Sequence, residues 1–160
     1  MNRWKQLIVI LCITFIGYNF YSKPDTDNWT EYRFELSNIK VQFPHTPKVE
    51  KHFIEGIGLE FTSARNEFAQ YTVSYMSGFG ITNDKFYPHA LVDKGATISY
   101  QKDIWVGEYL GKQFELDYKN KVAVQRFIDV KGATVQQTAI FSKKNRDNSF
   151  LDGFLDSLAL

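Results

Sequence analysis

The last third of the chain, residues 109–160, constrains the fold more strongly than any other part of the sequence. Hydrophobic and polar positions alternate through residues 109–118 and again through residues 121–143. A period of two is typical of strands with one buried and one wet face. Lys131-Gly132 interrupts the second run, and this pair can supply the positive φ angle of a tight hairpin. We therefore expect three consecutive strands that pair in antiparallel fashion.

The first of these strands should show the alternation most clearly. Its buried face is expected to carry the even-numbered residues, and its wet face the residues between them. The two sets are Leu110, Phe114, Leu116 and Tyr118 against Gly111, Gln113, Glu115 and Asp117.

The period then changes to that of a helix. The hydrophobic residues Phe150, Leu151, Phe154, Leu155 and Leu158 follow the i, i+1, i+4, i+5, i+8 spacing of a helical stripe. Asn148 or Ser149 can cap its start, and Asp152 stands three residues after Ser149, as in a weak capping box. Strands followed by an amphipathic helix predict an α+β fold built on an antiparallel sheet.

Three charged residues in this stretch allow two interpretations. Asp152 and Asp156 lie opposite the hydrophobic stripe, where the alternatives are a metal or acid–base site and a solvated helix face that compensates the helix dipole. Arg126 falls on the hydrophobic face of its strand. It either binds an acidic group in the interior or extends outward from a sheet edge. For all three residues the spacing favours the structural alternative.

The first 23 residues differ from the rest of the chain. Arg3 and Lys5 precede an uncharged apolar run over residues 7–21, which is either a signal-anchor helix or a signal peptide. The run is barely long enough to cross a bilayer. Bulky residues occupy the −3 position of the two cleavage sites considered, after Gly17 and after Ser22. We expect an uncleaved anchor, with the N-terminus in the cytoplasm and the domain outside. The alternative is a secreted or periplasmic domain released by cleavage.

The remaining residues divide into a short polar tether, residues 24–30, and one domain, residues 31–160. An aromatic content of 16% lets a chain of 160 residues bury a core without disulfides or metal. The single cysteine, Cys12, lies in the apolar run, so the domain has neither a disulfide nor a thiol nucleophile. Of 19 Lys and Arg, three precede residue 24, which leaves 16 against 18 acidic residues. This near-neutral balance argues against a nucleic-acid partner.

Before residue 109 the same alternation predicts further strands. Two hairpins are expected over residues 32–43 and 49–64, followed by strands over residues 68–76 and 98–106. Between these strands, residues 86–94 predict a short middle helix that packs on the sheet. Pro88 is acceptable only in the first turn of that helix, and Gly95 suits its C-terminal cap.

The sequence lacks the motifs that indicate a particular enzyme. His45, His52 and His89 have neither the spacing of a zinc site nor that of an HExxH helix. Gly78 and Gly80 begin like a phosphate loop, but the third glycine and the Lys-Ser/Thr pair are missing. No GxSxG elbow occurs. We expect no catalytic residue, no metal and no cofactor, although scattered carboxylates that converge in space leave a hydrolase open.

Three motifs within residues 31–160 resemble a known family. They are a Phe-Pro-x-x-Pro break at residues 43–47, a Tyr-x-Val-x-Tyr strand at residues 71–75 and a Phe-Leu-Asp-Ser-Leu helix at residues 154–158. In this order they resemble the small bacterial envelope proteins with a Mog1/PsbP-like domain. The resemblance implies an antiparallel sheet with helices packed on it, and binding or assembly roles instead of a shared reaction. It supplies no site residues, and the leader differs from lipoprotein members by lacking a small residue before Cys12.

Two functions follow as expectations. The first is a non-catalytic binding or assembly module of the cell envelope, anchored in the membrane through residues 7–21, with an envelope protein as its partner. The second is a small-ligand-binding protein or envelope enzyme with a pocket between sheet and helices. The first predicts a stable complex with another protein, and the second predicts converging polar groups at a binding site.

Overall fold

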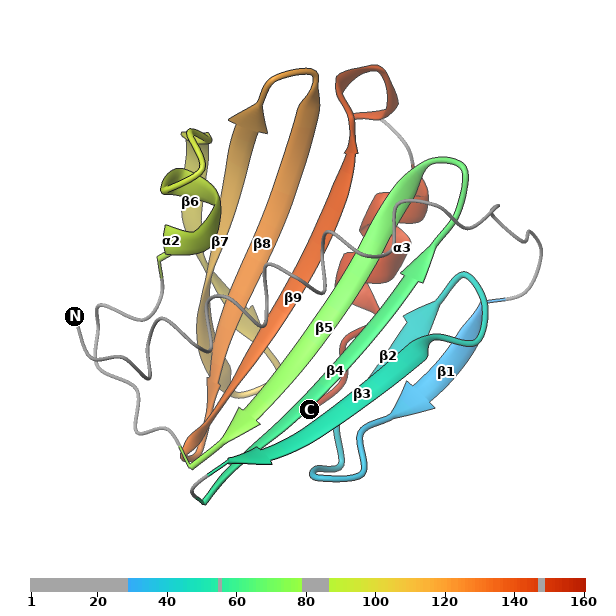
Figure 1. The fold of residues 1–160 in the computed structure, drawn as a ribbon, viewed down its shortest axis with the longest axis vertical. Helices are drawn as coiled ribbons and strands as arrows, with labels where there is room; N and C mark the ends of the chain where they lie inside the picture. The colour runs from blue at the N-terminus through green and yellow to red at the C-terminus, as the bar shows by residue number, and fades with distance from the viewer. Residues whose placement is uncertain (1–28, 55, 79–86, 147–148) are drawn as a thin grey trace.

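The computed structural model describes residues 29–54, 56–78, 87–146 and 149–160. These residues form a seven-stranded antiparallel sheet, a separate two-stranded hairpin and short helices, which confirms the expected antiparallel α+β architecture (Figure 1). In spatial order the sheet consists of β3 (Lys48–Ile54), β4 (Ile57–Arg65), β5 (Ala69–Ser77), β9 (Ala133–Ser142), β8 (Lys121–Val130), β7 (Tyr109–Tyr118) and β6 (Thr97–Val106). The separate hairpin pairs β1 (Thr30–Arg33) with β2 (Lys40–Phe43).

The helices lie on both faces of the sheet. They are α2 (His89–Val92), the 3₁₀ turn η3 (Lys143–Asn145) and α3 (Ser149–Asp156). One face, called the α3 face here, is covered by α3 and the β1–β2 hairpin, and α2 packs on the opposite face (Figure 1). Both faces of the sheet are therefore occupied, at least in part.

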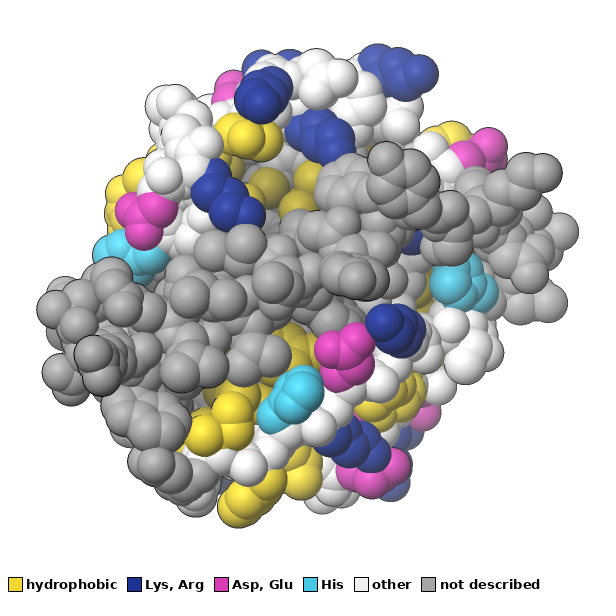
Figure 2. Space-filling view, viewed as in Figure 1, with side chains coloured by type: hydrophobic (Ala, Val, Ile, Leu, Met, Phe, Trp, Pro, Cys, Tyr) yellow, Lys and Arg dark blue, Asp and Glu magenta, His cyan; other side chains and the backbone are white. Residues whose placement is uncertain are grey.

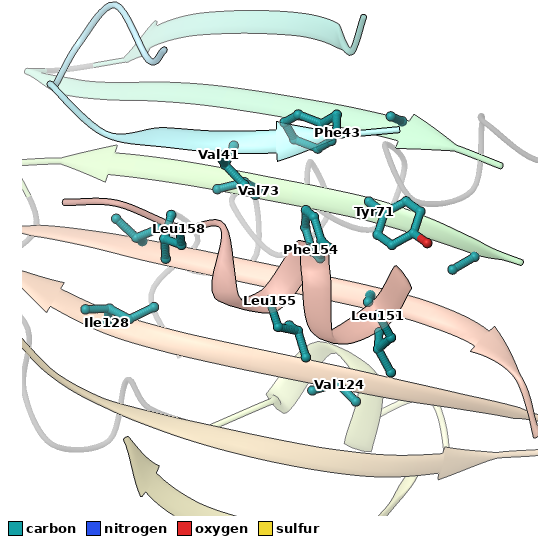
Figure 3. Close-up of a cluster of buried hydrophobic side chains, with 14 of the residues drawn as sticks. Val41, Phe43, Tyr71, Val73, Val124, Ile128, Leu151, Phe154, Leu155 and Leu158 are labelled. Atoms are coloured by element: carbon teal, nitrogen blue, oxygen red, sulfur yellow. The ribbon is translucent and has the colours of Figure 1, made fainter. Parts of the chain in front are cut away.

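The main core lies between the sheet and α3. The stripe predicted from the helical period is buried there: Leu151, Phe154, Leu155 and Leu158 meet strand residues such as Tyr71, Val73, Val124 and Ile128 (Figure 3). Phe154 and Tyr71 are both fully buried, with ring centroids 4.8 Å apart. The closing helix thus joins residues from strands that are far apart in the sequence.

The hairpin turns agree with the local sequence signals. Lys131 and Gly132 join β8 to β9 with φ angles of 36° and 85°, as the Lys-Gly pair predicted. The β1–β2 and β3–β4 hairpins form where the alternation placed them. Thr30 already belongs to β1, and the ring of Trp29 lies 5.8 Å from that of Tyr71, so these two residues of the expected tether pack with the domain.

The middle helix is shorter than expected. Only residues 89–92 are helical, because Pro88 stands at its N-terminal boundary and the chain turns at Gly95 with a φ of +92°. Leu91 and Val92 pack against the cluster formed by Phe114, Leu116, Ala123, Phe127 and Ala96. The predicted start at residue 86 lies outside the described residues.

The predicted buried face of β7 is confirmed at Phe114 and Leu116, but the prediction was wrong at Gln113 and Leu110. Gln113, on the expected wet face, is 6% exposed, whereas Leu110, on the expected buried face, is 48% exposed. Gln113 accepts a hydrogen bond from Arg126, which also binds the C-terminal end of α3. Leu110 lies near the β6–β7 turn, outside the cluster beneath α2. The covering elements, and not the alternation, decide which of these residues meets water.

Gly111 of β7 provides a stability test with a built-in control. A Cβ atom at this position would lie 2.6 Å from the backbone oxygen of Phe127, so we expect Gly111→Ala to lower the free energy of unfolding by about 1–3 kcal/mol. Gly153 is a helical glycine with open space around a Cβ atom, so Gly153→Ala is expected to raise stability by about 0.5–1 kcal/mol. Urea denaturation of both variants would measure these changes in the free energy of unfolding. If both variants changed it in the same direction, the packing described for Gly111 and Gly153 would be contradicted.

The predicted anchor, residues 1–23, and residues 24–28 of the tether lie outside the described residues. Within the described ranges, no helix is long and apolar enough to cross a membrane.

Candidate interaction surface

Two exposed aromatic residues lie on β6, one of the two edge strands of the seven-stranded sheet. Within the described part of the chain, this strand pairs only with β7, and seven of its ten residues are exposed. Trp105 is 69% exposed, Tyr100 is 50% exposed, and Leu110 of β7 is 48% exposed. We call these three residues the edge surface.

The β6–β7 hairpin explains why Trp105 and Leu110 point outward. Val106 and Tyr109, at the two ends of its turn, pack against the main core. Because successive side chains of a strand alternate between faces, their neighbours Trp105 and Leu110 must face the other way. Trp105 and Leu110 are also register partners, so they lie side by side. The hairpin is thus anchored on the α3 face and presents Trp105 and Leu110 on the opposite one, whereas Tyr100, paired with Glu115, lies at the edge on the α3 face.

The edge also carries features that limit strand addition by other chains. The β6–β7 register shifts between Ile98 and Tyr100, which places a bulge at Ser99. Lys102 and Asp103 occupy the middle of the strand, and the Asp103 carboxylate lies 3.7 Å from Lys112 Nζ. Bulges and charges of this kind protect edge strands from aggregation. The binding capacity of the edge therefore lies in its side chains, and Trp and Tyr are the types that dominate protein interfaces.

A second exposed apolar pair lies on the α3 face. Phe53 of β3 is 76% exposed and Leu36 of the β1–β2 turn is 41% exposed. A Cβ atom added at Gly58 would lie 3.1 Å from Leu36 Cδ1 and 3.4 Å from Phe53 Cε2, so both side chains pass close to this glycine. β3 and β6 are the two opposite edge strands of the seven-stranded sheet. The Phe53–Leu36 pair therefore serves below as the control site for the edge surface on β6.

Arg126 is not a residue that reaches out from a sheet edge, and that prediction was wrong. β8 is an interior strand, and the Arg126 side chain is only 14% exposed. The guanidinium donates to Gln113 Oε1 at 2.8 Å, to the backbone oxygen of Leu155, and to Asp156 Oδ1 at 3.4 Å. Desolvation by burial lowers the pKa of Arg126, and the Asp156 carboxylate opposes that shift. The residue stays charged and ties α3 to the sheet.

A buried carboxylate on β4 was missed by the sequence reasoning. Glu60 is fully buried; its Oε1 accepts hydrogen bonds from the Tyr32 hydroxyl at 2.6 Å and the Glu35 N–H at 3.2 Å. Its Oε2 accepts from the Leu36 N–H at 3.1 Å. The sequence carried one signal for this site. Glu60 alternates with Thr62 and Ala64, so an acidic residue lies on the same strand face as these two small residues. Glu60 holds the β1–β2 hairpin on the sheet and leaves no carboxylate oxygen without a partner.

The surroundings of three tyrosines predict a loss of stability at high pH. Burial, reinforced by Glu60, raises the pKa of Tyr32 well above its ordinary value, and burial raises the pKa of Tyr71 to about 12 and also raises that of Tyr75. Unfolded tyrosines ionise near pH 10. This stability is therefore fully present below about pH 10 and falls as pH rises above it.

The expected result is a falling denaturation midpoint between about pH 10 and pH 12, with tyrosinate absorbance increasing as the chain unfolds. Tyr71→Phe should make the midpoint less dependent on pH over this range. An unchanged dependence in that variant would contradict the assignment.

The other predicted site residues are dispersed. Asp152 is exposed, and Asp156, 74% exposed, contacts Arg126. His45 contacts the Arg65 carbonyl oxygen through Nε2 at 2.8 Å, His52 lies on β3, and His89 begins α2. Among the described residues, no three His, Cys, Asp or Glu side chains gather in a way that could hold a metal ion. Gly78 has a φ of +79°, and Gly80 lies outside the described residues.

Comparison with known proteins supports the fold assignment. No protein-family model and no curated protein matches the chain. The solved structure of CyanoP, the cyanobacterial PsbP of Synechocystis sp. PCC 6803, matches with a TM-score of 0.59, covering 90% of this chain and 99% of that one. The fold resembles that of the Mog1/PsbP-like family.

A second Mog1/PsbP-like match extends the comparison. PA94, a Pseudomonas aeruginosa protein of unknown function, covers 84% of this chain and 98% of its own length, with a TM-score of 0.50. Sequence identity is 10% to CyanoP and 12% to PA94. At such identities the likeness concerns the fold alone, and the resemblance expected from residues 43–47, 71–75 and 154–158 is confirmed at that level.

Proposed function

We propose that this chain is a non-catalytic binding or assembly module of the cell envelope. In this proposal residues 7–21 anchor it in the membrane, the domain lies outside the cytoplasm, and the edge surface binds another envelope protein. The observation that supports the binding role most directly is the exposure of Trp105 and Tyr100 on an edge strand. Trp and Tyr are among the side chains that most often dominate the binding energy of an interface.

The position of the edge surface suits a tethered protein. The chain enters the domain at Trp29 and β1, and the β1–β2 hairpin lies near β3 and β4 (Figure 1). β6 is at the other edge of the sheet. A partner could therefore approach the edge surface without displacing the hairpin that leads to the tether.

The first experiment is native mass spectrometry of the protein extracted in mild detergent from its own cells. A second polypeptide in a fixed ratio supports the assembly role, and a lone chain under gentle extraction contradicts it. The exact mass also distinguishes an uncleaved anchor from a domain released by loss of the leader.

The edge surface is tested by the double variant Tyr100→Ser/Trp105→Ser. Both side chains are exposed, so we expect folding to be retained and the co-purified partner to be lost. Phe53→Ser is the matched control, because Phe53 is at least as exposed as Trp105 and Tyr100 but lies on the opposite edge strand. Partner loss in the control but not in the double variant would move the interface to the other edge.

A further inference from the structure

Basic side chains gather at one end of the seven-stranded sheet, and the proposed assembly role does not use them. At this end β4 turns into β5, β7 turns into β8, and β9 leads into η3 (the upper end in Figure 1). Figure 2 shows Lys and Arg side chains along the same border of the domain. We call this cluster the basic end. It consists of Arg65, Lys119, Lys121, Lys143, Lys144 and Arg146.

Hydrogen bonds hold the three connections together. The Lys143 N–H donates to the Asn120 carbonyl oxygen at 3.1 Å, which joins η3 to the β7–β8 turn. Asn145 Nδ2 donates to the Phe68 carbonyl oxygen at 3.2 Å, which joins η3 to the β4–β5 turn. The basic end is therefore one continuous surface, although its residues come from distant parts of the sequence.

Positive charge exceeds negative charge at the basic end. Among the described residues, its six basic side chains are accompanied by three acidic ones, Glu67, Asp117 and Glu115. Lys143 pairs with Asp117 at 3.3 Å, and Arg146 pairs with Glu115 at 3.2 Å. The same end also carries Lys48 with Glu50 and Asp93 with Lys94, two pairs that add no net charge. The excess therefore belongs to the connections at the β7–β8 turn and η3.

The other positive charges of the basic end leave room for an anionic ligand. Lys119 and Lys144 are exposed, and neither forms a salt bridge within the described ranges. Burial and the nearby Arg65 lower the pKa of Lys121. An anionic group beside Arg65 and Lys121 would offset their repulsion, because an opposite charge favours the charged form of an amine.

The chain enters the domain at this same end. The Trp29 ring packs on Tyr71, the third residue of β5. β1 starts beside the last residue of β2, and His45, just after β2, contacts the Arg65 carbonyl oxygen at 2.8 Å. Residues 22–28, which span at most roughly 25 Å, separate the predicted anchor from Trp29. A connection of this length would keep the basic end close to a bilayer that holds residues 7–21.

We infer that the basic end docks on the anionic phospholipid surface of the membrane that holds the anchor. This inference rests on the anchoring in the proposed function and adds a second contact between the domain and the bilayer. Each Lys or Arg near an anionic bilayer strengthens binding about fivefold. The connections of the basic end contain none of the large hydrophobic side chains that are exposed in the described residues, whereas aromatic anchors dominate protein interfaces. Headgroup contacts therefore suit this end better than a protein partner does.

Docking through the basic end also determines what faces away from the bilayer. The β6–β7 and β8–β9 turns lie at the opposite end of the sheet, and Trp105 is next to the first of them. In that turn region Lys131 pairs with Glu108 at 3.6 Å, so the charges there are balanced. A docked domain would therefore hold Trp105 towards a partner outside the membrane.

The test is hydrogen exchange of the full chain in lipid nanodiscs, made either of phosphatidylcholine alone or with added phosphatidylglycerol. We expect the amides of residues 119–121 and 143–146 to exchange at least about fivefold more slowly in the anionic discs. High salt should remove the difference, because it screens the charges. The amides of residues 107–108 and 131–132, at the opposite end, should exchange equally in both kinds of disc. Equal exchange at the basic end as well would overturn the inference.

Two double variants locate the contact. Lys119→Gln/Lys144→Gln should weaken docking about 25-fold, about fivefold for each lysine. Lys102→Gln/Lys131→Gln removes the same charge away from the basic end and should leave the protection unchanged. All four side chains are exposed, so neither variant should lower the melting temperature. Full protection in the first variant, or its loss in the second, would overturn the assignment to the basic end.

Two further measurements separate this inference from its alternatives. Retention of the chain in phosphatidylcholine discs tests the anchor alone. If the chain leaves those discs, the anchoring fails; co-sedimentation of the same chain with anionic vesicles then supports the basic end by itself, and its absence overturns it. Polyglutamate added to the neutral discs stands in for an acidic protein. Protection as strong as that in the anionic discs would assign the basic end to an acidic protein and overturn the choice of lipid.

Discussion

Replacing Phe154 with alanine is expected to lower the free energy of unfolding by about 3–5 kcal/mol. Phe154 is fully buried, and its ring lies 4.8 Å from that of Tyr71 and 5.7 Å from that of Phe43 (Figure 3). Its removal would leave a cavity between α3, β2 and β5, because packed interiors relax only partly around a lost ring. Single domains have about 5–15 kcal/mol of stability, so this loss is a large share of the total.

The Phe154 prediction is measured by urea denaturation, followed by far-UV circular dichroism. Phe53→Ala is the control, since its ring is 76% exposed and its loss should change stability by less than about 0.5 kcal/mol. If the two variants lost equal stability, α3 would not be packed on the sheet as described.

Glu60→Ala is expected to lower stability by about 3 kcal/mol or more. The substitution removes the acceptor of three hydrogen bonds at once, from the Tyr32 hydroxyl and from the N–H groups of Glu35 and Leu36. Each buried donor left without a partner costs about 1–3 kcal/mol. We also expect the β1–β2 hairpin to loosen locally, because this carboxylate connects it to β4.

Hydrogen exchange of the Glu35 and Leu36 amides would report that loosening directly. Glu50→Ala is the matched control, because Glu50 lies on the neighbouring strand and makes a partly exposed salt bridge with Lys48 at 3.0 Å. Such pairs contribute about 0–1 kcal/mol. The role given to Glu60 would be contradicted if the Glu35 and Leu36 amides exchanged faster in Glu50→Ala. It would also be contradicted if their exchange were not accelerated in Glu60→Ala.

These two positions also bear on function. Phe154 and Glu60 fix the elements of the α3 face, whereas Trp105 and Leu110 of the edge surface lie on the opposite face. Destabilising variants should therefore reduce binding only as far as they unfold the domain. Variants at Trp105 should reduce binding of a partner without unfolding the domain.

Local periodicity was sufficient to predict most of the elements. The alternation over residues 109–143, the Lys131-Gly132 turn and the stripe through Phe154 all correspond to observed strands, a hairpin and a helix. These features depend on side-chain period and backbone conformation, which are properties of neighbouring residues. The fold class follows from the same signals. The interpretation of residues 7–21 as an anchor stays a prediction.

Tertiary structure alone decided which residues meet and which are exposed. β5 pairs with β9 across more than fifty intervening residues, and no local pattern specifies that neighbour. Arg126 became an interior contact because α3 ends above it, and Gln113 and Leu110 exchanged their expected exposures for a similar reason. Alternation by itself determines which residues of a strand share a face. What covers that face depends on long-range packing, and this packing placed Glu60 in the core and Trp105 at the edge.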